Sequence, residues 1–228
     1  RFKAKSKDGD QLLEYRIQDI PEDQFDEAAK FQCEYLIPNA NLFKALKITS
    51  NPKAVEEFHK LFMEKLREKI SIACYCDEEL IAVNVLFVSS KNDPKANVSQ
   101  KDHEIQSFFE FRAYSKQNYN VFEAHSVDKF LTAFGLSVKT EYQGRGIATE
   151  MLKARIQVLK KLGLKVTSTS FSALGSQIAA QKAGYKVAFE MKYEDIMRAL
   201  PKFDFSQSDT GIHKTMEFVK VHFKIKLR

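Results

Sequence analysis

The sequence predicts a mixed α/β (α+β) protein in which a central β-sheet is flanked by helices. The chain has 228 residues, of which 44% are hydrophobic, and apolar runs alternate with amphipathic segments along it. A strand-like run at 130–138 is followed by a glycine-containing basic turn and a long amphipathic stretch. A chain of this length without a linker-like tract can bury a large core. We therefore expect one domain spanning residues 1–228.

The first part of the chain predicts a strand, two helices and a hairpin. Residues 15–20 are typical of a short strand, and Pro21 with the acids after it opens a helix. After a less regular connection, Asn51-Pro52 opens a second helix that is expected to run to about residue 69. Two β-rich runs at 70–76 and 80–88 follow, joined by three residues, which is the length of a hairpin connection.

The rest of the chain predicts helices and strands in alternation. Helices are expected where the apolar residues recur with helical spacing, at 105–114, 121–130, 146–162 and 172–183. Strands are expected where β-branched or alternating residues occur, at 130–138, 165–170, 186–193 and 215–227.

The turn at residues 143–148, Gln-Gly-Arg-Gly-Ile-Ala, carries the clearest functional signal. Its glycines allow positive φ and a close approach of the backbone to a ligand, and the first N–H groups of the next helix are unpaired donors at the positive end of the dipole. Thr149 stands where a dinucleotide fingerprint needs a third glycine, and a Gly-Lys-Ser/Thr sequence is absent. The turn therefore predicts a pyrophosphate site of another kind.

The pattern Gln/Arg-x-x-Gly-x-Gly/Ala in this turn resembles the acetyl-CoA loop of the GNAT family of N-acetyltransferases. The similarity extends from residue 120 through the loop to residue 193, about a third of the chain, with looser agreement over 16–88, and points to the insect arylalkylamine branch. The resemblance implies a GNAT fold, whose mixed central sheet is splayed at the acetyl-CoA site. It also implies that acetyl-CoA is the cosubstrate.

The resemblance implies two groups of cofactor contacts. The backbone of the strand before the loop would hold the pantetheine amides through Leu136, Ser137 and Val138. The pyrophosphate would lie on the loop itself, against Gln143, Gly144, Arg145, Gly146, Ile147 and Ala148.

The resemblance also shows that a general base is missing from its usual place. An alkylamine has a pKa of about 10.4, so a base is expected to deprotonate it. The insect enzymes use the Glu of a Glu-Pro-Leu motif, but here Ala40 stands at the Glu and Asn41 at the Pro. Glu34 is the nearest substitute, with Asp26 and Glu27 further back.

Ser172 and Ser176 are candidate catalytic residues, because residues four apart project from the same side of a helix. They match the paired serines of the insect enzymes, which implies that one is a substrate or proton-relay group and the other lies near the thiolate. Thr169, Ser170 or Ser172 could instead cap the helix. Ala180 occupies the position at which many GNAT enzymes have a tyrosine acid.

An amine pocket is expected to be lined by aromatic side chains. The candidates in segments bordering the cleft are Tyr35, Phe43, Phe108, Phe109, Phe111 and Phe171.

Composition narrows the possible partners. The net charge of +6 and the pI near 9.0 favour an anionic partner, and coenzyme A meets that requirement. The lysines are not interleaved with aromatic residues in one block, so we expect no nucleic-acid partner. Three cysteines and scattered histidines give neither a disulfide framework nor a metal site, and no apolar run is long enough for a membrane span.

The leading hypothesis is a cytoplasmic, monomeric N-acetyltransferase that moves acetyl directly from acetyl-CoA to a primary amine, with dopamine, tyramine or serotonin as the type of acceptor. A polyamine or agmatine acceptor, or a longer acyl-CoA, remains a second reading. A third reading is an acyl-CoA-binding module with impaired catalysis, because Ala40 replaces the expected base.

Overall fold

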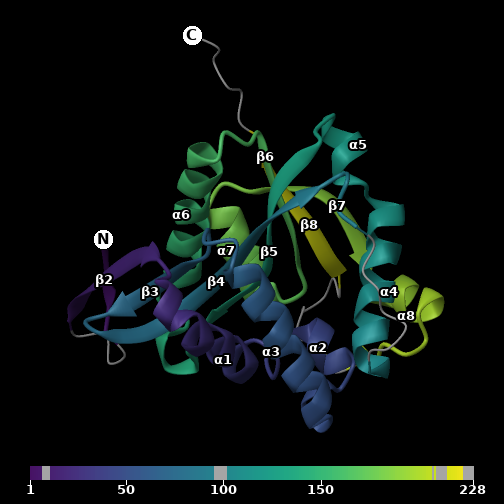
Figure 1. Ribbon diagram of the computed structural model, residues 1–228, viewed down its shortest axis with the longest axis horizontal. Helices are drawn as coiled ribbons and strands as arrows, with labels where there is room; N and C mark the ends of the chain where they lie inside the picture. Colours follow the sequence, from purple (N-terminus) through teal and green to yellow (C-terminus); the bar gives the residue numbers. More distant parts are fainter. Residues whose placement is uncertain (7–10, 95–101, 207, 209–214, 223–228) are drawn as a thin grey trace.

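The computed structural model describes residues 1–6, 11–94, 102–206, 208 and 215–222, and its strands form one mixed sheet between helices (Figure 1). This confirms the predicted fold class. The strands are β1 (Phe2–Lys5), β2 (Leu12–Asp19), β3 (Ile72–Cys76), β4 (Glu79–Ser90), β5 (Lys129–Val138), β6 (Val166–Phe171), β7 (Lys186–Lys192) and β8 (Thr215–His222).

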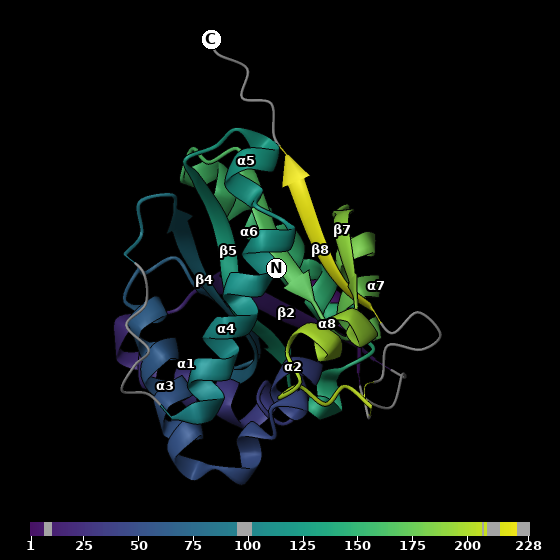
Figure 2. The same cartoon turned by 90° about the vertical axis from the view of Figure 1, so that its right-hand side faces the viewer.

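The helices lie on both sides of this sheet (Figures 1 and 2). The α-helices are α1 (Phe25–Tyr35), α2 (Asn41–Ala45), α3 (Pro52–Leu66), α4 (His103–Asn118), α5 (Val121–His125), α6 (Ile147–Lys161), α7 (Leu174–Lys182) and α8 (Tyr193–Ala199). The short 3₁₀ helices are η1 (Glu22–Gln24), η2 (Ile48–Ser50) and η3 (Thr140–Tyr142).

The sheet order is β1-β2-β3-β4-β5-β6-β8-β7, and Figure 1 shows β2 and β3 at the left and β7 and β8 at the right. Neighbouring strands are antiparallel except β5 and β6, which are parallel. In the described part of the sheet, these two strands share one Cα pair, Leu131 with Thr167. Beyond that pair β5 continues to Val138 against β4 alone, so one of its edges is open.

A bulge in β5 lies just past this separation. Val85 pairs with Gly135 and Leu86 pairs with Ala133, so Phe134 has no partner in β4. The φ angle of Gly135 is +151°, and a Cβ there would lie 2.3 Å from Cδ2 of Leu36. The absence of a side chain therefore lets the end of α1 approach β5 closely.

Two hydrophobic clusters hold the layers together. The larger one is rich in phenylalanine and packs α1, α3, α4 and α8 against one face of β4 and β5. Phe134 is in contact with four rings of this cluster, which are Phe58, Phe62, Phe87 and Phe108. The second cluster packs α6 against β2, β3, β4 and β5 on the other face. The edge of β5 is therefore fixed from both sides.

Several predicted boundaries were wrong for identifiable reasons. The helix predicted to run to 69 ends at Leu66, and the backbone is left-handed at Lys69 (φ 57°). The helix predicted at 121–130 ends at His125, because Ser126 is left-handed (φ 50°) and the chain then enters β5. β1 and α8 were not predicted at all. Residues 223–227 of the last predicted strand lie outside the described residues.

Replacing Gly135 by alanine should destabilise the fold by about 1–3 kcal/mol, because the new Cβ would overlap Leu36 at an unfavourable φ. Urea unfolding followed by circular dichroism measures the change. Gly175→Ala is the matched control: it lies in α7, where nothing lies within 4 Å of an added Cβ. The control should be neutral or stabilising. Equal stabilities of the two variants would contradict the assigned role of Gly135.

Candidate functional site

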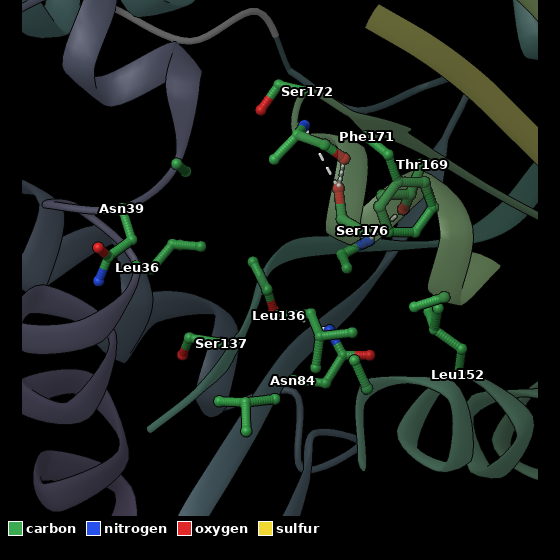
Figure 3. A pocket seen from close by; sticks show the side chains of 18 of the residues that line it. Leu36, Asn39, Asn84, Leu136, Ser137, Leu152, Thr169, Phe171, Ser172 and Ser176 are labelled. Carbon is green, nitrogen blue, oxygen red and sulfur yellow. Dashed lines mark hydrogen bonds between the residues drawn. The ribbon is translucent and has the colours of Figure 1, made fainter. Parts of the chain in front are cut away.

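A pocket of about 670 Å³ lies where β5 and β6 separate. Its lining comes from the end of α1 and α2, from β4 and α4, from β5 and the loop after it, from α6, and from β6 and α7. Figure 3 shows Leu36 and Asn39 on one side of the space, with Ser172 and Ser176 across from them. No three His, Cys, Asp or Glu residues in the described part of the chain group as a metal site would require.

The loop predicted to bind pyrophosphate forms one end of this pocket. Gly144 and Gly146 have φ angles of +78° and +82°, and Gly146 is the N-cap of α6. An added Cβ at either glycine would meet nothing within 4 Å, so the loop surface is open for a ligand. The Gln143 amide donates to the Val138 carbonyl at 3.1 Å and fixes the loop to β5. The pocket is also lined here by Ile147 and Ala148.

Unlike its neighbours in the loop, Arg145 is not a lining residue of the main pocket. Its guanidinium donates to the Tyr15 hydroxyl at 3.3 Å and to the Glu141 carbonyl, and lies 4.8 Å from the ring centre of Tyr142. Its side chain therefore turns back toward β2, and Arg145 does not line the main pocket. Lys182, at the end of α7, lines the pocket instead. We had not identified this lysine from the sequence.

The end of β5 forms a wall of the pocket through Leu136, Ser137 and Val138. Ser137 is buried, and its hydroxyl donates to the Gln32 side chain of α1 at 2.8 Å. The Gln32 amide in turn donates to the carbonyls of Val83 at 3.2 Å and Gly135 at 3.4 Å. This buried network fixes α1 to β4 and β5.

Asn84 is a buried polar residue of β4 at the same wall. Its amide nitrogen donates to the Gly135 carbonyl at 2.7 Å, but its Oδ1 atom has no partner in the described part of the structure. Figure 3 shows Asn84 between Leu136 and Leu152, beneath Ser176. A buried acceptor without a partner is costly, so this oxygen could accept a hydrogen bond from a ligand donor. In the sequence, this residue is a single asparagine within the apolar run of β4, and we had not identified it as a candidate site residue.

Arg155 of α6 holds the point at which β5 and β6 separate. Its Nη2 donates to the carbonyl of Leu131 at 3.1 Å, to the carbonyl of Ser168 at 3.3 Å and to Oγ1 of Thr169 at 2.9 Å. The Thr167 hydroxyl also donates to the Leu131 carbonyl, at 2.8 Å. These side chains replace the backbone pairing that ends at this point. Complete burial lowers the pKa of Arg155.

The two candidate serines do not share a helix face. Ser172 precedes α7, whereas Ser176 lies in its first turn, so the expectation that both project from one helix was wrong. The Ser176 hydroxyl donates to the Ala173 carbonyl at 2.7 Å, as Figure 3 shows. Both serines line the pocket. The Ser172 carbonyl accepts hydrogen bonds from Tyr193 and from Asn41, the latter at 2.7 Å.

The acidic candidates lie away from this pocket. Glu34 is exposed on α1 and does not line it, whereas the next residue, Tyr35, does. Loss of solvation and the Glu34 carboxylate raise the pKa of Tyr35. Asp26 is paired with Lys30 at 2.6 Å, and neither it nor Glu27 lines the pocket. No Asp, Glu, His or Cys is found among the described lining residues.

Aromatic side chains form much of the wall of the pocket. Of the six predicted, five line it, which are Tyr35, Phe43, Phe108, Phe111 and Phe171. Phe109 packs against the large cluster instead. Phe43, Phe108 and Phe111 belong to the large phenylalanine cluster, as do Phe87 and Phe134, which also line the pocket. We call these five rings the aromatic end of the pocket. Phe171 packs against α6 and α7 instead.

The fold and the pocket define an α/β protein with an open strand edge beside a helix N-terminus. A profile of the acetyltransferase (GNAT) family matches residues 51–185. Among solved structures, a candidate arylalkylamine N-acetyltransferase 7 from the yellow fever mosquito Aedes aegypti is 31% identical, with a TM-score of 0.87, over 97% of this chain and 92% of that one.

Two further structures share the fold. Arylalkylamine N-acetyltransferase 2 of Aedes aegypti is 17% identical (TM-score 0.77) over 92% of this chain and 99% of that one. Drosophila melanogaster polyamine N-acetyltransferase, which forms N-acetylagmatine, is 14% identical (TM-score 0.78) over 92% of this chain and 100% of that one. A search of curated proteins finds no match. The chain belongs to the GNAT family of N-acetyltransferases, as the resemblance implied, and this family uses acetyl-CoA.

Replacing Arg155 by methionine should weaken coenzyme A binding about 5- to 30-fold, the equivalent of roughly 1–2 kcal/mol, because the hydrogen bonds that hold β5 and β6 apart are lost. Isothermal titration calorimetry measures the affinity. Arg155→Lys keeps one donor and should lose less, and circular dichroism checks that both variants fold. Unchanged affinity in a folded Arg155→Met protein would show that the arginine does not shape the site.

Proposed function

We propose that this protein transfers an acetyl group from acetyl-CoA to a primary amine, most simply an arylalkylamine of the dopamine, tyramine or serotonin type. The open edge of β5, which continues into the glycine loop at the N-terminus of α6, carries the proposal. An extended pantetheine can pair with such an edge as a further strand would. Unpaired N–H groups at a helix N-terminus suit a diphosphate.

The residues present fit coenzyme A along the pocket. The backbone of Leu136, Ser137 and Val138 would hold the pantetheine, and residues 143–148 the diphosphate. The unpartnered Oδ1 of Asn84 offers an acceptor beside the strand edge. Because the Arg145 side chain is engaged with Tyr15, we assign its contribution to the backbone rather than to its charge.

Acetyl-CoA supplies an activated thioester when bound; the amine nitrogen forms the new C–N bond as the C–S bond breaks, and the amine proton is lost. Ser172 and Ser176 line the pocket and remain our candidates for contact with the acceptor and with the departing thiolate. Transfer is direct in this proposal, because no cysteine is among the described residues that line the pocket. Burial also raises the pKa of the Cys33 thiol to about 11 and that of Cys74 to about 12.

The lining favours an aromatic monoamine over a polyamine or agmatine. Five of the predicted aromatic residues face the pocket, and aromatic rings stack favourably on one another. A polyamine carries a second positive charge, which would need an acidic partner that the described lining does not offer. Glu34 remains a candidate base only if it acts through Tyr35, whose hydroxyl it neighbours.

One observation favours a second candidate, an acyl-CoA-binding protein with weak catalysis. No group in the described lining is a carboxylate or an imidazole, and Ala40 lines the pocket where the family places its glutamate. Tight acetyl-CoA binding without turnover would support this candidate.

The transferase proposal is tested by coupling coenzyme A release to a thiol reagent with a panel of dopamine, tyramine, serotonin, agmatine and spermidine. We expect release above background with the arylalkylamines and less with the two polycations. Denatured protein and reactions without amine are the controls. Background release with every amine, despite binding of acetyl-CoA in calorimetry, would refute transfer to this class of acceptor.

The rate should rise with pH because the described lining offers no base. We expect log kcat/KM for tyramine to increase with a slope near 1 between about pH 6 and 9, as the neutral amine becomes more abundant. An acceptor of lower amine pKa should reach its plateau at correspondingly lower pH. Steady-state assays across this range measure the profile. A plateau that begins near pH 7 for both acceptors would reveal a base that we have not identified, and Glu34→Gln would then test the one candidate.

A further inference from the structure

The charged residues of the pocket are all of one sign. In the described lining they are Lys44, Arg112, Arg155 and Lys182, with no carboxylate among them. Lys182 lies near the loop at 143–148, since it also lines a small pocket beside that loop. The Arg155 guanidinium is already hydrogen-bonded to β5 and β6. The other two cations, Lys44 and Arg112, do not line the small pocket beside the loop.

Lys44 and Arg112 line the same pocket as the phenylalanine rings. Lys44 follows Phe43 on α2, and Arg112 lies one turn after Phe108 on α4. Phe43 and Phe108 stack with their ring centres 5.9 Å apart. The guanidinium carbon of Arg112 lies 5.7 Å from the centre of the Phe87 ring, which lines the same space. The two cations therefore come from different helices and line the same pocket as these rings, and Arg112 contacts one of the rings directly.

Neither cation forms an ion pair with a carboxylate among the described residues, although Asp93 is close enough to act on the charge of Arg112. Elsewhere on the protein many lysines are paired, such as Lys30 with Asp26 at 2.6 Å and Lys139 with Glu79 at 2.6 Å. Lys44 and Arg112 form no such ion pair and no side-chain hydrogen bond there, although both are accessible to solvent. The protein around Arg112 lowers its pKa by desolvation, which the charge of Asp93 partly offsets. An anion that enters the pocket would be attracted by both cations.

These observations set a condition on the acceptor. A simple ammonium compound brings only positive charge to an end of the pocket that is already positive, which is unfavourable. If the acceptor also has a carboxylate beside the amine, this repulsion is replaced by attraction. A guanidinium group binds a carboxylate through two parallel hydrogen bonds. An aromatic ring on the same molecule would lie against the phenylalanines.

We propose that the preferred acceptor is an aromatic amine that also bears a carboxylate, as an aromatic amino acid does, and that Arg112 and Lys44 recognise the carboxylate. This inference rests on the proposed transferase function and narrows its acceptor. Arg112 and Lys44 are specificity-determining residues in this account, and the reacting atoms lie nearer β5 and Ser172.

Matched acceptor pairs test the inference, because tyrosine differs from tyramine, and tryptophan from tryptamine, only by the carboxylate. We expect kcat/KM for each acid to exceed that for its amine by on the order of tenfold at a pH corrected for amine ionisation. Arg112→Gln and Lys44→Gln should each reduce this ratio several-fold, mainly through KM, while Arg112→Lys should keep part of it.

Lys53→Gln is the control for net charge, since Lys53 is exposed on α3 and does not line the pocket. It should leave the ratio unchanged. Turnover of tyramine with no preference for tyrosine, or a ratio insensitive to Arg112→Gln, would overturn the inference and leave the transferase function intact. Absence of turnover with all four acceptors would instead count against the transferase proposal itself.

Discussion

The separation of β5 from β6 is the constraint on which the rest of the site depends. The two strands share one parallel pair, at Leu131 and Thr167, and the buried guanidinium of Arg155 bonds to both strands at that point. The open edge of β5, the loop after it and the pocket all follow from this geometry. The fold thus converts an interruption in backbone pairing into a place where an extended ligand can complete the hydrogen bonding.

Elements on the two faces of the sheet form different parts of the pocket wall. The phenylalanine cluster under α1, α3 and α4 forms part of the pocket wall, and Gly135 lets the end of α1 come close to β5. On the opposite face α6 follows its N-cap Gly146, and the residues at its start line the other end of the pocket. Rigid elements on both sides reduce the ordering needed when two substrates must meet in one orientation.

The sequence was sufficient for the parts of the site that local rules determine. A glycine turn between an alternating strand and an amphipathic helix has few structural outcomes, so the loop at 143–148 and the helix after it were predicted. Residues whose role depends on distant partners could not be found in this way. Asn84 and Arg155 donate hydrogen bonds to strands that are distant from them in the sequence. The Ser172 carbonyl accepts one from Tyr193, a residue of a helix that was not predicted.

The position of β8 has a consequence for how the protein is made. This strand follows β7 in the chain but lies between β6 and β7 in the sheet. While the ribosome is still adding the residues before 215, β6 and β7 have no strand to join them and their polar edges face solvent. Unpaired strand edges are a template for pairing with another chain, so β8 removes this hazard when it joins the sheet.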